Sequence, residues 1–174
     1  GEWHRALTAL CLHADLSHLA ANLVFGGLFL MFLSPRLGAG VAWLLVVGAG
    51  FAGNLLNAWV YGEQGHRSLG ASTAVFGGLG VLVGLEMIAV LRGRGWGPVR
   101  RMILPLGAGL ALLAWLGTEG EQTDILAHLW GFLAGLGSGA AYGLCGETPV
   151  ARWARALAGG AVWAALILAW AAAW

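Results

Sequence analysis

The sequence contains no lysine, and charged residues of every kind make up only 10% of it. The nine arginines and eight acidic residues leave a formal net charge of +1 and form no basic patch, so nucleic acid is not an expected partner. The two cysteines, Cys11 and Cys145, have neither the CxxC nor the Cys/His spacing of a metal site. We therefore expect no metal and no other cofactor.

Apolar residues and glycine take the place of charge. Of the residues, 59% are hydrophobic, and the chain has 30 glycines and 10 tryptophans. A soluble domain of this length carries far more charge. The composition is typical of an integral membrane protein surrounded by a lipid bilayer.

Charged residues divide the chain into runs of roughly the 20 residues that a membrane-spanning helix needs. Each run is interpreted as a transmembrane helix. This predicts an all-α, polytopic membrane helix bundle and a single membrane domain over residues 1–174. The six predicted spans are 16–35, 37–62, 68–85, 102–118, 125–146 and 156–174.

The arginines set the predicted orientation, because basic residues in short loops stay on the cytoplasmic side of a membrane. An outside N-terminus leaves only Arg5 and Arg67 in outer segments. A chain that starts outside without a targeting signal is expected to be a domain of a longer protein. The same topology puts a membrane thickness between Cys11 and Cys145, which excludes a disulfide between them. The inner loops then hold Arg36, Arg92, Arg94, Arg100, Arg101, Arg152 and Arg155.

A few polar side chains fall at membrane depth, all near the predicted outer face. His18 and Asn22 are spaced i, i+4 on the first span and share a face. Ser72 lies at the outer end of the third span, and His128 lies in the outer half of the fifth. Each has a structural explanation: a serine can bond back to a carbonyl, and histidine or asparagine can join helices.

Together, these side chains provide the groups that acyl transfer requires. The Ser72 hydroxyl can act as a nucleophile and the His128 imidazole as its base. His18 and Asn22 can donate hydrogen bonds to an oxyanion. Glycines spaced three or four residues apart would let the two helices that carry Ser72 and His128 approach closely. These are Gly77, Gly80, Gly84, Gly131, Gly135 and Gly139.

Three stretches, in this order, resemble motifs of the rhomboid intramembrane serine proteases: "GEWHRALTALCLHADLSHLAAN", "GASTAVFGGLG" and "AHLWGFLAG". The resemblance covers residues 2–146 and implies a catalytic dyad of Ser72 and His128. It further implies an oxyanion hole of His18, Asn22 and the backbone N–H of Ser72. Residues implied to line the site are His13, Gly70, Thr73 and Phe76.

The resemblance also implies how the chain is organised. The core of this family has six helices, the first preceding an outer loop with a Trp-Arg pair, and this chain begins at that loop with Trp3 and Arg5. Residues 1–146 would then be the core from the outer loop onward, with a first helix missing, and residues 152–174 an additional helix. Four departures from the family pattern are Thr73 for a glycine, Phe76 for a tyrosine, His4 for a tryptophan and Ser34 for a glutamate.

The expected function is a serine endopeptidase that cuts transmembrane segments of other proteins near their outer ends. The inner membrane of a bacterium is the expected location, with the active site toward the outer face. A catalytically inactive relative that binds membrane proteins is the alternative. A small-solute transporter would use intramembrane histidine and asparagine as a polar path, but the paired repeats with broken helices typical of transporters are absent from the sequence.

The predicted topology can be tested by single-cysteine labelling in a background without Cys11 and Cys145. We expect a cysteine placed between Arg92 and Arg101 to be labelled only from the cytoplasm, because this loop holds the most arginines. A cysteine between Glu119 and Asp124 should be labelled from outside. The reverse pattern would move Ser72 and His128 to the cytoplasmic side.

Overall fold

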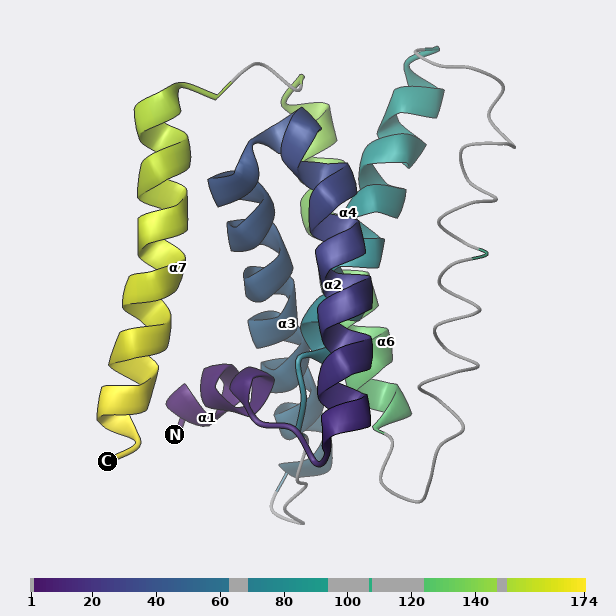
Figure 1. Cartoon of the computed structure of the whole chain (residues 1–174). Coiled ribbons are helices and arrows are strands. Elements are labelled where there is room, and N and C mark those ends of the chain that lie inside the picture. The colour runs from purple at the N-terminus through teal and green to yellow at the C-terminus, as the bar shows by residue number, and fades with distance from the viewer. Residues whose placement is uncertain (1, 63–68, 94–106, 108–123, 147–149) are drawn as a thin grey trace.

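The structure is a computed structural model that describes residues 2–62, 69–93, 107, 124–146 and 150–174. The described part contains helices and no strand (Figure 1). A short helix, α1 (His4–Thr8), and a 3-10 turn, η1 (Ala9–Cys11), lie across one end of a bundle of longer helices. The longer helices are α2 (Leu16–Leu37), α3 (Ala39–Tyr61), α4 (Ser72–Leu91), α6 (Ile125–Leu144) and α7 (Arg152–Ala172).

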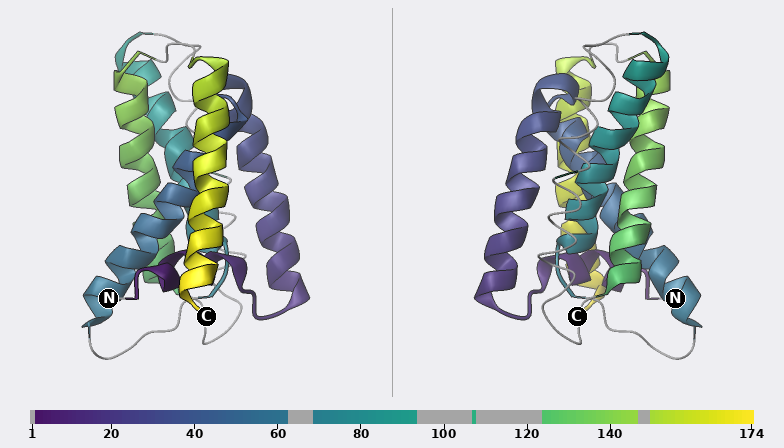
Figure 2. Two further views of the ribbon diagram at one scale, coloured as in Figure 1. Left: turned by 90° about the vertical axis from the view of Figure 1, so that its left-hand side faces the viewer. Right: turned by 90° about the vertical axis from the view of Figure 1, so that its right-hand side faces the viewer.

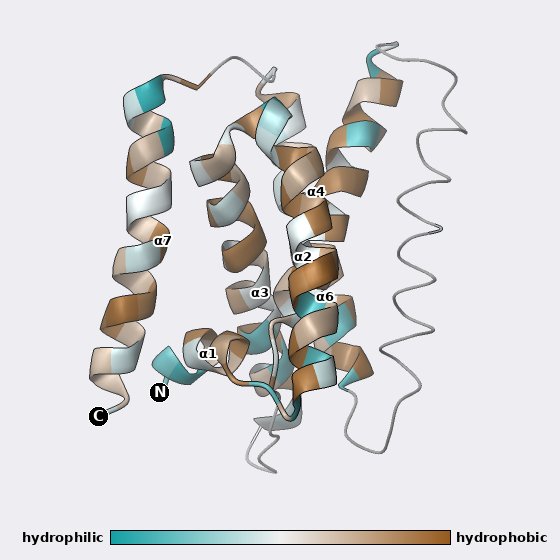
Figure 3. Cartoon of the chain, viewed as in Figure 1, coloured by the Kyte–Doolittle hydropathy of each residue, from teal (hydrophilic) through white to brown (hydrophobic). Residues whose placement is uncertain are grey.

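These five helices are long and apolar enough to cross a membrane, as the composition predicted. The sixth predicted span, 102–118, lies outside the described residues. Large apolar side chains such as Leu23, Trp59 and Trp163 are exposed on the outside of the bundle, where lipid would cover them. Figure 3 shows apolar residues along all five helices, with hydrophilic residues at α1 and the start of α2. The chain is a multi-pass membrane protein with an all-α fold.

Three helices extend beyond the charge-free runs that predicted them. Helix α2 continues past residue 35 to Leu37. The run 68–85 stops before Glu86, yet α4 continues to Leu91. The Glu86 carboxylate lies 2.5 Å from the Arg36 guanidinium of α2, and this pairing offsets the charge that was expected to end the span. Helix α7 begins at Arg152 instead of residue 156, because a long arginine side chain can reach the membrane surface from a helix end.

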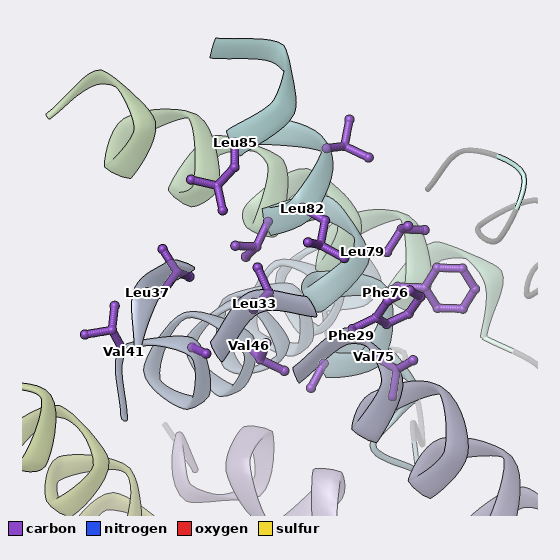
Figure 4. Close-up of a cluster of buried hydrophobic side chains, with 14 of the residues drawn as sticks. Phe29, Leu33, Leu37, Val41, Val46, Val75, Phe76, Leu79, Leu82 and Leu85 are labelled. Atoms are coloured by element: carbon purple, nitrogen blue, oxygen red, sulfur yellow. The ribbon is translucent and has the colours of Figure 1, made fainter. Parts of the chain in front are cut away.

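Helix α4 forms the centre of the bundle. Every residue from Ser72 to Leu85 is buried, because α2, α3 and α6 all pack against this helix. Figure 4 shows the apolar cluster that α4 shares with α2 and α3. Its members include Phe29, Leu33, Leu37, Val41, Val46, Phe76, Leu79, Leu82 and Leu85.

The contact between α4 and α6 is close enough to require glycine. A Cβ at Gly131 would meet the carbonyl oxygen of Thr73, and one at Gly135 would meet that of Gly77. Gly139 faces the carbonyl of Val81 in the same way. Helices in lipid gain little from the hydrophobic effect, so van der Waals contact between closely spaced backbones holds them together.

The polar groups divide between the two ends of the bundle. Helix α1, the starts of α2 and α6, and the points marked N and C all lie at one end of the bundle (Figures 1 and 2). We call this the α1 end. At the opposite end, Arg36 and Arg92 lie near the last turns of α2 and α4, and Arg152 begins α7. The Arg92 guanidinium there donates to the carbonyls of Gly143 and Leu144 and caps α6.

Gly135→Ala should destabilise the bundle, because its Cβ would press against the Gly77 backbone, which cannot turn aside as a side chain can. We expect the free energy of unfolding in detergent to fall by about 1–3 kcal/mol. The matched control is Gly137→Ala on the same helix, where nothing lies within 4 Å of the added carbon. The control should keep or slightly raise stability, since alanine favours helix over glycine. Equal losses of unfolding free energy in the two variants would contradict the close α4–α6 contact at Gly135.

Candidate active site

Ser72 and His128 form a buried pair near the α1 end. Ser72 is the first residue of α4 and His128 lies in the first turn of α6, and both are 5% exposed. The Nε2 atom of His128 lies 2.9 Å from Ser72 Oγ, which is hydrogen-bonding distance. Gly131, the next turn along α6, lies against the Thr73 backbone and makes this approach possible. The pair therefore joins a hydroxyl and an imidazole at the starts of two parallel helices.

The His128 ring stacks on Phe76, one turn after Ser72 on α4. The ring centroids lie 4.5 Å apart with an interplanar angle of 22°. The other ring nitrogen, Nδ1, is buried and has no hydrogen-bond partner among the described residues. Packing on Phe76, and not a carboxylate at Nδ1, thus orients this imidazole.

His18 lies beside the residues that precede Ser72. Gly70 has φ +121°, and a Cβ there would lie 2.6 Å from His18 Cε1 and 3.6 Å from Ser72 Oγ. Only glycine fits this backbone conformation and this space. Asp15 caps α2 by accepting the backbone N–H of His18 at 2.7 Å, which fixes the turn that carries the imidazole.

Asn22 lies one turn after His18 and is 4% exposed. Both its Oδ1 and its Nδ2 are buried and have no hydrogen-bond partner in the part of the chain that the structure describes. A buried amide left unpaired costs roughly 1–3 kcal/mol per group, so such groups are rare in folded proteins. The described residues therefore leave both polar atoms of this amide unpaired.

His13 is hydrogen-bonded to the segment just before Ser72. The backbone N–H of Ala71 donates to His13 Nε2 at 3.4 Å, and the rings of His13 and His18 meet edge to face at 5.3 Å. Burial lowers the pKa of His13, and repulsion from His18 lowers it further, while a hydrogen bond to the Cys11 backbone raises it. The lowered pKa favours the neutral ring, which can accept the Ala71 N–H.

Thr73, which the family resemblance implies to be a site-lining residue, packs where three helices meet. Its methyl group lies between Gly53 of α3 and Gly131 of α6, close to where a Cβ of either glycine would be. The side chain is 1% exposed. It therefore fills the junction of three helices, where its bulk packs α4 against α3 and α6 beside the Ser72–His128 pair.

Sequence reasoning missed one group of contacts near His128. Asp124, which the predicted topology places on the outer side, caps α6 by accepting the Ala127 N–H, and Asn57 of α3 donates to its second oxygen. An aspartate three residues before this N–H is a recognised helix-start signal. The Asn57 contact has no such signal, because it joins residues 67 positions apart.

The fold and the pair define a polytopic helical membrane protein with a buried serine and histidine at one end of its bundle. The family model described as "Rhomboid domain" matches residues 1–145. The chain belongs to the rhomboid family.

Curated relatives agree with this assignment. "Putative rhomboid protease YdcA" of Bacillus subtilis is 31% identical over 78% of this chain and 65% of its own length. "Rhomboid protease GluP" of the same species is 31% identical over 83% of this chain and 27% of its own length. "Inactive rhomboid protein 1" of Drosophila melanogaster is 33% identical over 76% of this chain and 9% of its own length. The chain thus matches less than two thirds of each of these relatives, and no solved structure matches it significantly.

Proposed function

We propose that this protein is an intramembrane serine protease that cuts transmembrane segments of other membrane proteins. The observation that carries the proposal is the 2.9 Å approach of Ser72 Oγ and His128 Nε2 inside a rhomboid-family helix bundle. A hydroxyl becomes a useful nucleophile when a positioned base can take its proton. The names of two relatives, which describe rhomboid proteases, support the same activity.

His128 acts first as general base and then as general acid. It accepts the proton of Ser72 Oγ as that oxygen attacks the scissile carbonyl carbon, and then gives the proton to the leaving amine. The products of this step are an acyl-enzyme on Ser72 and a free amine. His128 then takes a proton from water as the water oxygen attacks the ester. It returns this proton to Ser72 Oγ as the acid leaves. The Phe76 ring holds the imidazole in line through both steps.

The oxyanion of each tetrahedral intermediate is held by His18, Asn22 and the backbone N–H of Ser72. The amide of Asn22 is buried and unpaired among the described residues, so donating to a developing charge would break no hydrogen bond within the described protein. His18 lies against Gly70, close to Ser72 Oγ. The N-terminus of α4 adds its positive helix-dipole end and first-turn N–H groups at the same point.

The site's position in the bundle suggests how substrate and water enter. Ser72 and His128 lie close to the α1 end, where the exposed Asp15 and Ser17 and the partly buried His13 make the surface polar. Water enters from this end, and a transmembrane substrate is cut near the corresponding end of its own helix. By the arginine distribution this is the outer face, in the inner membrane of a bacterium.

One relative named as inactive favours a second candidate, a catalytically inactive membrane-protein binder. The two candidates differ in one property, the reactivity of Ser72.

A fluorophosphonate should therefore attach covalently to the purified protein at Ser72, because only an activated serine attacks such a phosphorus centre at a useful rate. Ser72→Ala should abolish both labelling and cleavage of a model transmembrane substrate. His128→Ala should reduce both labelling and cleavage nearly as far. The variant with both substitutions should be no less active than Ser72→Ala alone, since the two residues act as one unit. Ser138→Ala, on α6 toward the arginine end, is the matched control and should label fully. Cleavage that survives Ser72→Ala would refute the dyad, and an unlabelled, inactive parent would favour the binder.

The oxyanion donors give a second, separate expectation. Asn22→Ala or His18→Ala should lower kcat by about 10- to 1000-fold, as the loss of such a donor does, while leaving KM within a few-fold. Because Asn22 makes no hydrogen bond within the described protein, its removal should leave the unfolding temperature unchanged or raised. Full kcat in a variant lacking both side chains would exclude them from the mechanism.

A further inference from the structure

The ring of His128 is not held through its second nitrogen. Nδ1 is buried and has no hydrogen-bond partner among the described residues. In serine hydrolases with a triad, a carboxylate at this nitrogen fixes the imidazole. Here the position of the ring depends on Phe76 and on where the backbone of α6 places residue 128.

Asp124 fixes that part of the α6 backbone. Its Oδ1 accepts the Ala127 N–H at 2.9 Å, and its main-chain carbonyl accepts the N–H of His128 itself at 3.2 Å. The first turn of α6 is therefore built on Asp124, and any movement of this residue carries His128 with it.

Asn57 ties Asp124 to a different helix. Its Nδ2 donates to Asp124 Oδ2 at 2.5 Å. A carboxylate can only accept, so the nitrogen of the amide must face it. Asn57 is 2% exposed, and a hydrogen bond to a charged acceptor is strong where water is excluded.

A second contact between α3 and α6 lies on the other side of His128 along the chain. A Cβ at Gly53, one turn before Asn57, would lie 2.7 Å from the backbone nitrogen of Gly131. His128 thus lies between two points at which α3 holds α6, one polar and one of close backbone contact.

We propose that Asn57 is a positioning residue for His128. By holding the Asp124 cap to α3, it fixes where the imidazole lies along the axis of α6 relative to Ser72 Oγ. This inference rests on the proposed protease function. Asn57 does not touch the reacting atoms and acts only through Asp124 and the first turn of α6.

The chain offers a matched control on the same helix. Asn54, one turn earlier, is also buried and donates from Nδ2 at 2.9 Å, but to the carbonyl of Ala6 in α1. Asn54→Leu and Asn57→Leu each remove one buried amide hydrogen bond, and only the second removes a contact to α6.

The experiment measures kcat and KM for a model transmembrane substrate, the fluorophosphonate labelling rate, and the unfolding temperature of both variants. Asn57→Leu should lower kcat and the labelling rate about 10- to 100-fold, since small displacements of a catalytic group have effects of this size, with KM unchanged. Asn54→Leu should keep both rates within about twofold of the parent at a similar loss of stability. Equal rates in the two variants would overturn the positioning role.

Exchanging the amide of Asn57 and the carboxylate of Asp124 tests the proposal even if Asn57→Leu fails to fold. Asn57→Asp places two carboxylates face to face and should be at least as slow as Asn57→Leu. Adding Asp124→Asn restores one amide and one carboxylate: the new amide oxygen can accept the Ala127 N–H and its nitrogen can donate to position 57. The double variant should recover kcat to within about threefold of the parent. A double variant as slow as Asn57→Asp would overturn the proposal.

The two proposals fail in different ways. A parent protein with no cleavage and no labelling at Ser72 refutes the protease function and with it the role of Asn57. A parent that labels at Ser72, with Asn57→Leu matching Asn54→Leu, refutes the role of Asn57 alone.

Discussion

The geometry of the site depends on the close contact between α4 and α6. The carbonyls of residues 73, 77 and 81 on α4 meet Gly131, Gly135 and Gly139 on α6, in steps of four residues on both helices. Because the helices are parallel, this series fixes their register along the bundle axis. A slip by one turn would move His128 by about 5.4 Å relative to Ser72 and separate the pair. Glycine spacing in the membrane interior thus decides a hydrogen bond near the bundle's end.

Helix starts place the polar groups of the site. His18 and His128 each lie in the first turn of a helix that begins with an aspartate, and Asp15 and Asp124 bind the backbone N–H groups of those turns. The carboxylates therefore act on the backbone, while the imidazole of His128 faces Ser72 and that of His18 lies against Gly70. Phe76 holds His128 by stacking, a contact that needs no polar partner in lipid. The result is a serine–histidine pair with little charge around it at membrane depth, where charge is most expensive.

Much of this arrangement could be predicted from the sequence, because it depends on local spacing. Charge-free runs predicted the five described spans, and glycines spaced three or four residues apart indicated which faces of α4 and α6 could meet. Motif resemblance indicated the Ser72 and His128 pair, which the structure brings within hydrogen-bonding distance. Contacts between distant helices were not predictable in this way. Glu86 extends α4 because it meets Arg36, and Asn57 meets Asp124 only because α3 packs beside α6.

At Asn22, stability and the proposed function favour different side chains. An apolar side chain of similar size would avoid the cost of about 1–3 kcal/mol for each unpaired buried amide group. The fold keeps the amide all the same, one turn from His18 and with neither its donor nor its acceptor used within the described protein. Departures from stable packing of this kind concentrate at functional sites. The fold tolerates the cost of this unpaired amide because the stability of the α4–α6 contact does not depend on Asn22. That contact is made by glycines along most of the length of both helices.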